Sequence, residues 1–127
     1  MSARASCKLC SWMSTQTMND ELGLAVSVDD RFPVSPGHVL IMVRRHEPDF
    51  FALSEEERAD IWSLVARERG RLATRLGTDD FNVGLNAGVH AGQTVAHAHV
   101  HLIPRFPGDV PDPRGGVRGV VPPKRLY

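Results

Sequence analysis

The stretch QTVAHAHVHLIPR, residues 93–105, holds three of the six histidines of the chain, spaced two residues apart. A spacing of two is the period of a β-strand, in which alternate side chains point to the same face of the sheet. A strand here places His97, His99 and His101 on one face, with Val95 and Ile103, and the intervening apolar side chains in a core. A row of three histidines bounded by a glycine-containing turn and a proline is uncommon by chance. The stretch therefore predicts a strand whose open face is a functional site.

The length and charge of the chain limit its class. A chain of 127 residues is close to the commonest size of a single domain. Lysine plus arginine and aspartate plus glutamate number 15 each, so the formal net charge is zero, which argues against broad binding to nucleic acid or to a membrane surface. We find no secretory signal and no apolar run approaching about 18 residues, so we expect a cytoplasmic protein.

Other segments of the chain have their own patterns. Alternating or continuous apolar residues predict strands at 22–28, 38–43 and 81–86, the second buried on both faces. Ser54 and Glu57 form a capping-box pattern at the start of one long helix, for which Gly77 is a suitable C-cap. The short connection to the histidine strand predicts that 81–86 pairs with it in antiparallel fashion.

Three blocks of this sequence resemble one known family. The segment His97–Ile103 matches the histidine triad (HIT) pattern, in which three histidines alternate with apolar residues. The segment 30–40, with its Ser-Pro-Gly-His motif, resembles the second block, and Asn86 followed by Gly-Gln-Thr at 92–94 resembles the third. The match covers roughly residues 20–105, with order and spacing intact.

The resemblance implies an α+β fold with a five-stranded antiparallel sheet, one long helix and one short helix. It implies a single HIT domain over residues 1–127, with an N-terminal zinc-knuckle segment at 1–19 and a proline- and glycine-rich C-terminal tail at 106–127. It also implies a homodimer that acts on small nucleotide substrates.

The resemblance implies roles for the residues of a catalytic site. His99 attacks the α-phosphorus of a nucleotide, and a backbone carbonyl is expected to hold its other ring nitrogen, because a neutral imidazole has one donor and one acceptor nitrogen. His101 donates to a phosphate oxygen, and His38 orders the cluster or the phosphate. Gln93 donates to the bridging or leaving-group oxygen.

Four further residues are expected to bind the substrate. Asn86 touches the phosphate or sugar, Gly92 lets the backbone approach the phosphate, and Thr94 donates to it. Asp30 accepts from the ribose hydroxyls, although an aspartate after a strand is also a common turn residue.

A second group of residues has the composition of a metal site. Cys7 and Cys10 form a C-x-x-C pair, which in a reducing compartment indicates a metal site or a redox pair. With His46 and His97 they offer the four sulfur and nitrogen ligands of a closed structural zinc site. The alternative is two free thiols and a capping histidine. We expect no organic cofactor.

The leading functional hypothesis is a nucleotide hydrolase that cleaves dinucleoside polyphosphates or nucleoside phosphoramidates through a nucleotidyl-histidine intermediate. One alternative is a nucleotidyltransferase or phosphorylase, in which phosphate accepts the nucleotidyl group. Another is a nucleotide-binding interaction protein whose catalysis is incidental. A metal-dependent hydrolase that uses the triad as ligands is less favoured, because three histidines on one extended strand are too widely spread for a single ion.

Overall fold

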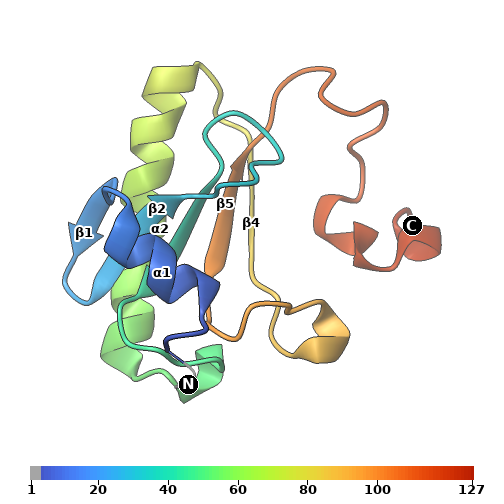
Figure 1. Cartoon of the computed structure of the whole chain (residues 1–127). Coiled ribbons are helices and arrows are strands. Elements are labelled where there is room, and N and C mark those ends of the chain that lie inside the picture. The colour runs from blue at the N-terminus through green and yellow to red at the C-terminus, as the bar shows by residue number, and fades with distance from the viewer. Residues whose placement is uncertain (1–3) are drawn as a thin grey trace.

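The computed structural model describes residues 4–127; residues 1–3, the beginning of the predicted segment 1–19, lie outside the described residues. The structure contains one antiparallel sheet in the order β1-β2-β3-β5-β4 (Figure 1). The predicted α+β fold with five strands, one long helix and one short helix is thus confirmed. The strands are β1 (Asp20–Leu22), β2 (Ala25–Asp29), β3 (Val39–Val43), β4 (Phe81–Gly84) and β5 (Val100–Pro104), and the helices are α1 (Lys8–Thr15) and α2 (Glu55–Leu76).

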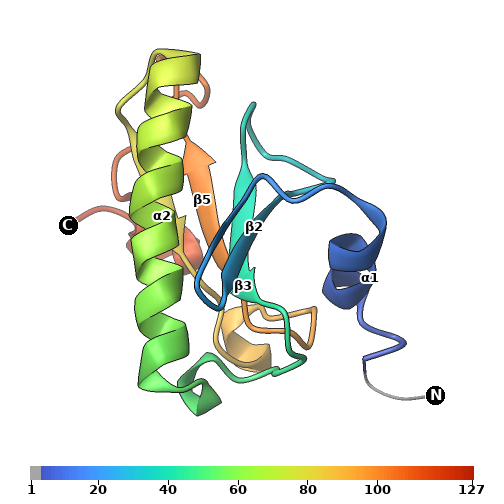
Figure 2. The same ribbon diagram turned by 90° about the vertical axis from the view of Figure 1, so that its left-hand side faces the viewer.

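The sheet lies between the two helices, with α2 against one face and α1 near the other (Figure 2). This arrangement explains why β3 is buried on both faces, as its continuous apolar sequence predicts. Val39, Ile41 and Val43 belong to the core cluster under α2. Leu40 and Met42 belong to a second cluster that contains the buried residues of α1.

The predicted ends of the long helix are confirmed. The Ser54 hydroxyl accepts from the Glu57 amide at 3.0 Å, and the Glu57 carboxylate accepts from the Ser54 amide at 2.8 Å, which completes the capping box. The helix ends at Gly77, whose φ of +71° is a left-handed conformation that glycine adopts without strain.

The single strand predicted at 22–28 is wrong, because this segment is a hairpin. Leu22 pairs with Ala25, so Gly23 and Leu24 form a two-residue turn between β1 and β2. Gly23 has a φ of +56°, and the Leu24 amide donates to the Asp60 carboxylate of α2 at 2.9 Å. A glycine at the first position of such a turn favours a hairpin over a continuous strand.

The histidine strand begins later than predicted, at Val100, so only His101 of the triad lies in a strand. The chain bends at residues 95–97, where the His97 amide donates to the Val95 carbonyl at 2.9 Å. The prediction that all three histidines lie in one strand is therefore wrong, although His97, His99 and His101 all face α1. Within β5 the expected alternation holds, since Val100 and Leu102 are buried and His101 is part-exposed. β4 pairs with β5 in antiparallel fashion, as predicted, but ends at Gly84.

The two ends of the described chain lie outside the sheet. Helix α1, whose place the sequence pattern did not predict, begins at the C-x-x-C pair, where the Cys7 sulfur accepts from the Cys10 amide at 3.4 Å. Beyond β5 the tail forms two 3-10 turns, η3 (Gly116–Val120) and η4 (Pro122–Lys124), and η3 lies beside the edge strand β4 (Figure 1). Two further 3-10 turns are η1 (Phe50–Ala52) and η2 (Val89–Ala91).

Among the described residues, no helix has the length and apolar character needed to span a membrane.

Candidate functional site

A pocket of about 280 Å³ lies between α1 and the loop that joins β4 to β5. It brings together residues that are up to 93 positions apart in the chain, from Lys8 to His101. The predicted site residues that line it are Asp30, Asn86, Gly92, Gln93, Thr94, His99 and His101.

His99 enters this pocket from the segment just before β5. Its Nδ1 atom lies 2.7 Å from the backbone carbonyl oxygen of His97. A carbonyl can only accept, so Nδ1 carries the proton and Nε2 keeps its lone pair. The carbonyl partner expected from the sequence is thus present, and the remaining nitrogen of His99 has the electronic form of a nucleophile.

His38 and His101 are joined by a chain of hydrogen bonds that fixes both rings. The Val34 amide donates to Nδ1 of His38 at 3.1 Å, so the proton of a neutral His38 lies on Nε2. Nε2 of His38 lies 2.9 Å from Nδ1 of His101, so the proton on Nε2 is donated to Nδ1. His101 therefore carries its own proton on Nε2 and is a hydrogen-bond donor through that atom.

Burial keeps both rings neutral. It lowers the pKa of His101 to about 4, with added repulsion from His99 and His38. Burial also lowers the pKa of His38, and the nearby Asp30 carboxylate opposes that shift. His38 is only 3% exposed and lies behind His101 rather than in the pocket wall.

Asp30 has the turn-forming role that the sequence allows, and it also lines the pocket. One carboxylate oxygen accepts from the Phe32 amide at 2.9 Å, which is the turn-forming role. The other lies 3.5 Å from Nε2 of His38 and belongs to a residue of the pocket wall.

Asp30, His38 and His101 lie close enough to be considered as a metal site, since one ligand atom from each falls within 4.8 Å of the others. The Val34 amide argues against this use. A metal on Nε2 of His38 needs a proton on Nδ1, but Nδ1 already accepts a proton from that amide. The group is better described as a hydrogen-bonded cluster.

The β4–β5 loop is held by the side chain of Gln93. Its amide nitrogen donates to the carbonyls of Pro48 and Val95 at 2.8 and 3.1 Å, and its oxygen accepts from the Gly88 amide at 2.9 Å. Donation to a substrate therefore requires Gln93 to exchange one of these backbone partners. Gly92, with a φ of +95°, and the exposed Thr94 are placed on the pocket side of this loop.

Sequence reasoning missed the pocket wall that α1 provides. Lys8, Leu9 and Trp12 line the pocket, together with Phe32. The Lys8 ammonium lies 5.8 Å from the centre of the Phe32 ring, and Trp12 and Phe32 are 6.2 Å apart between ring centres. The four-residue spacing of Lys8 and Trp12 places both on one face of a helix, a signal that becomes readable only once α1 is assigned.

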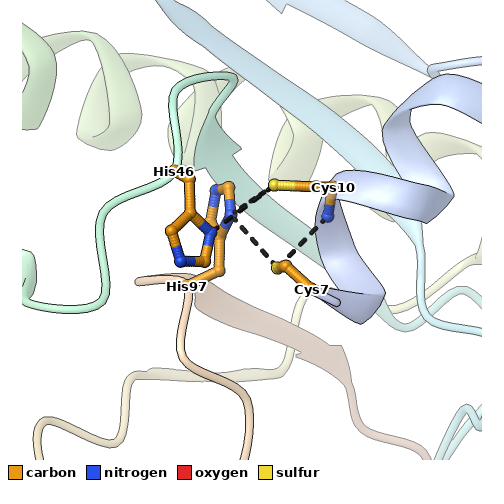
Figure 3. Close-up of side chains that lie close together, drawn as sticks. All are labelled: Cys7, Cys10, His46 and His97. Carbon is orange, nitrogen blue, oxygen red and sulfur yellow. Dashed lines mark hydrogen bonds between the residues drawn. The ribbon is translucent and has the colours of Figure 1, made fainter. Parts of the chain in front are cut away.

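The second predicted site is also assembled. Cys7 and Cys10 come from α1, His46 from the loop after β3, and His97 from the segment before β5, and all four converge (Figure 3). Nδ1 of His97 lies 3.6 Å from the Cys7 sulfur and 3.5 Å from the Cys10 sulfur, and Nδ1 of His46 lies 3.6 Å from the Cys10 sulfur. One ligand atom from each residue lies within 4.8 Å of the others.

These separations suit a tetrahedral metal ion. Zinc bonds of about 2.3 Å to sulfur and about 2.0 Å to nitrogen, at the tetrahedral angle, place sulfur and nitrogen roughly 3.5 Å apart. His97 also has the outer partner that metal-bound histidines commonly have, because its Nε2 lies 2.9 Å from the Val43 carbonyl and leaves Nδ1 free as a ligand. The four residues therefore fit a closed metal site.

The fold and the two clusters are those expected of the histidine triad class. The HIT domain family matches residues 14–108, and the chain belongs to this family.

Two relatives are named for enzyme activities, and one solved structure has a similar fold. The chain is 36% identical over 77 residues to the bifunctional bis(5'-adenosyl)-triphosphatase/adenylylsulfatase of Arabidopsis thaliana, covering 61% of this chain and 43% of the relative. It is 32% identical over 100 residues to the AP-4-A phosphorylase of Mycobacterium tuberculosis, covering 72% and 51%. The chain thus spans about half or less of the length of these curated relatives. A zinc-bound histidine triad family protein from Mycobacterium smegmatis matches with a TM-score of 0.72 at 29% identity, covering 86% of each chain.

Proposed function

We propose that the protein is a nucleotide hydrolase that cleaves at the α-phosphate of dinucleoside polyphosphates or nucleoside phosphoramidates. The observation that carries the proposal is the 2.7 Å contact between Nδ1 of His99 and the His97 carbonyl, which leaves the Nε2 lone pair available in a pocket beside a donor, His101. The relative from Arabidopsis is named as a bis(5'-adenosyl)-triphosphatase, and this similarity supports the substrate class.

The reaction has two steps. The Nε2 lone pair of His99 forms a bond to the α-phosphorus, the bond to the leaving group breaks, and the leaving group departs with that electron pair. Water then attacks the same phosphorus, its oxygen forms the new bond, and the phosphorus–nitrogen bond breaks, which returns the lone pair to His99. The proton of the water goes to solvent or to the departed group.

The other pocket residues bind the substrate and stabilise the negative charge that develops on the phosphoryl oxygens. The Nε2 proton of His101 faces a phosphoryl oxygen, where a fixed donor acts without reorganisation. His38 acts through His101, because it holds the ring in the tautomer that donates. Asp30 accepts from the ribose, Asn86 and Thr94 donate to sugar or phosphate, and the backbone at Gly92 approaches the phosphate. Gln93 faces the leaving group after it gives up one backbone carbonyl.

We also propose that Cys7, Cys10, His46 and His97 hold a structural zinc ion. When bound, it supplies a fixed link between α1 and the segment before β5. The sulfur–nitrogen separations of 3.5–3.6 Å support this proposal, as does the zinc-bound relative of similar fold. Metal analysis of the wild type and Cys7→Ser tests it, and equal, near-zero zinc in both would end it.

A homodimer is the assembly we propose. β4 is an edge strand, and a hollow of about 400 Å³ beside it is lined by apolar side chains including Val83, Val117 and Val120. Exposed apolar surface at a sheet edge is suited to association with a second copy. Sedimentation of the full chain tests this assembly.

A phosphorylase is the second candidate function, and the similarity to the AP-4-A phosphorylase of Mycobacterium tuberculosis favours it. In that reaction phosphate replaces water in the second step, so the product is a nucleoside diphosphate. Adding inorganic phosphate and identifying the products separates the two. A mononucleotide in both conditions supports the hydrolase, and a diphosphate supports the phosphorylase.

The decisive test of the hydrolase proposal uses substrates labelled at the α-phosphate. A panel should compare a dinucleoside polyphosphate with an adenosine phosphoramidate, and rapid quenching should trap acid-labile label on His99. His99→Ala should trap none and lose turnover. Turnover without labelled protein, and with inversion at phosphorus, would instead indicate direct attack by water.

A further inference from the structure

His97 belongs to both candidate sites, the metal cluster and the pocket that contains His99. Its side chain is fully buried in the cluster with Cys7 and Cys10, at 0% exposure. Its backbone carbonyl accepts the Nδ1 proton of His99 at 2.7 Å. One residue therefore belongs to the metal site through its ring and to the nucleophile through its main chain.

The position of the His97 ring is defined from both sides. Nε2 donates to the Val43 carbonyl at 2.9 Å, which ties the ring to the end of β3. Nδ1 faces the two cysteine sulfurs of α1. The main chain beside it is held by the Ala98 amide, which donates to the Glu47 carbonyl at 2.7 Å. Glu47 is the residue after His46, so the loop that supplies another cluster member also holds this segment.

The segment lacks the regular pairing that would fix it otherwise. Residues 95–97 form a bend outside β5, and the His97 amide donates locally to the Val95 carbonyl. A carbonyl in a bend can rotate away when its peptide unit shifts, whereas one in the middle of a sheet ladder cannot do so without breaking the ladder. The His97 carbonyl shares a peptide unit with the Ala98 amide, so its direction depends on the bond from that amide to Glu47, the residue after His46, and on the anchoring of the His97 ring.

This direction matters because a neutral imidazole has two tautomers. With the His97 carbonyl in place, the proton of His99 stays on Nδ1 and the lone pair stays on Nε2. Without it, the proton distributes over both nitrogens and the ring loses its preferred orientation. Only one of these states presents a lone pair to a substrate.

We propose that His97 is a positioning residue that couples the two sites: an ion bound by Cys7, Cys10, His46 and His97 fixes the His97 carbonyl, and that carbonyl fixes the tautomer and orientation of His99. The expected effect on turnover rests on the proposed function. The coupling itself is a statement about the tautomer and orientation of the His99 ring, and it does not need that function. The metal site is then a support of the nucleophile as well as of the fold.

The test removes the ion without altering His97. In His46→Asn the remaining ligands, the His97 ring and its main chain are retained. Full-length wild type and variant, both prepared with zinc, are compared by metal content, by ¹⁵N NMR of the histidine rings at one pH, and by kcat and KM. The matched control is Ile61→Val, a buried change in α2 that lowers stability without touching either cluster.

The coupling predicts that wild type binds one zinc ion and that His99 gives the pattern of a single Nδ1–H tautomer. His46→Asn should lose the zinc, show a mixture of tautomers at His99, and lose kcat by about tenfold, as is typical when an outer partner of a site is removed. KM should rise as well, because α1 lines the pocket. Ile61→Val should keep the zinc, the single tautomer and kcat.

The results that overturn the coupling are distinct. A zinc-free His46→Asn with an unchanged His99 pattern contradicts it, and so does a wild type that takes up no zinc. If His46→Asn keeps zinc or fails to fold, Cys10→Ser and chelator-treated wild type provide the same comparison. A wild type inactive on every substrate, but with a zinc-dependent His99 tautomer, contradicts the proposed function and leaves the coupling standing.

Discussion

Nδ1 of His101 lies 2.9 Å from Nε2 of His38, and this contact determines which nitrogen of each ring carries the proton. The positions of the two protons are set from outside the pair, because the Val34 amide donates to Nδ1 of His38. A main-chain amide in the loop before β3 therefore determines that His101 donates through Nε2. The residue that contacts the substrate in our proposal is thus controlled by one that does not.

Replacing His38 should therefore reduce turnover without removing a substrate contact. In His38→Ala the Nδ1 atom of His101 loses its donor, so His101 divides between two tautomers. We expect kcat to fall by about tenfold, as for other outer partners, and His101→Ala to fall by about 100-fold or more, as for a lost donor to a developing charge. Steady-state kinetics on the same substrate measures both. His90→Ala, in the exposed loop turn η2, is the control, and a kcat for His38→Ala equal to that control would refute the tautomer argument.

The lowered pKa of His101 should appear in the pH dependence of stability. In the folded protein its pKa is about 4, against about 6.5 for an unperturbed histidine. Between these values the unfolded chain binds the proton and the folded chain does not, so the free energy of unfolding decreases as the pH falls through this window. The contribution is fully present above about pH 6.5 and is lost by about pH 4.

Urea unfolding at several pH values across this window measures the effect. His101→Asn should show a shallower loss of stability between the two pKa values than the wild type does. His90→Asn, an exposed histidine, should keep the wild-type slope. Equal slopes in His101→Asn and the wild type would mean that His101 is not the group responsible.

Local rules were sufficient for the parts of the fold that depend on neighbours in sequence. The capping box at Ser54, the glycine at position 77 and the continuous apolar run of β3 each predicted what the structure contains. The residue at which the histidine strand begins could not be predicted in this way. The period of two extends from 95 to 103, but the bend at 95–97 comes with the burial of His97 against cysteines 87 and 90 residues away.

The candidate site shows the same division. The carbonyl partner of His99 and the grouping of Cys7, Cys10, His46 and His97 were predicted from the sequence and are present. The role of His99 as nucleophile and that of the four residues as zinc ligands stay predictions. The pocket wall from α1 and the donation from Val34 to His38 were missed, because both depend on how loops and a short helix pack after folding. Hairpin formation at Gly23 was missed for a simpler reason, since apolar residues on both sides of the turn continue the alternation of a single strand.

Two glycines should respond to alanine with opposite signs. Gly23 has a φ of +56°, and a Cβ there would contact the Asp60 carboxylate that accepts from the Leu24 amide. We expect Gly23→Ala to lower the free energy of unfolding by about 1–2 kcal/mol, the cost of a left-handed alanine. Gly70 lies in α2 with open space around it, so Gly70→Ala should raise it by about 0.5–1 kcal/mol. Chemical denaturation of both variants tests this, and two changes of the same sign would contradict the assigned turn.

The strongest test of the core concerns Glu68, a carboxylate with no exposed surface under the sheet. Its oxygens accept from the Ser27 hydroxyl at 2.5 Å and from Nε of Arg71 at 2.5 Å. Removing one partner of a buried ion pair leaves the others without compensation, so Glu68→Ala should lower the free energy of unfolding by about 3 kcal/mol or more. Glu56→Ala, on the exposed first turn of the same helix, should change it by less than about 1 kcal/mol.

A double-mutant cycle separates the hydrogen bond of Ser27 from the ion pair. Ser27→Ala alone removes one of the two hydrogen bonds to Oε1 of Glu68, which still accepts from Arg71 at 3.1 Å. In the Glu68→Ala background the carboxylate is absent, so Ser27→Ala removes no hydrogen bond to it. The two changes should therefore be non-additive by about 1 kcal/mol or more, as expected for neighbours in one network. Additive losses would show that Ser27 does not stabilise the Glu68 carboxylate, and the stability of this part of the sheet would then rest on the Arg71 contact alone.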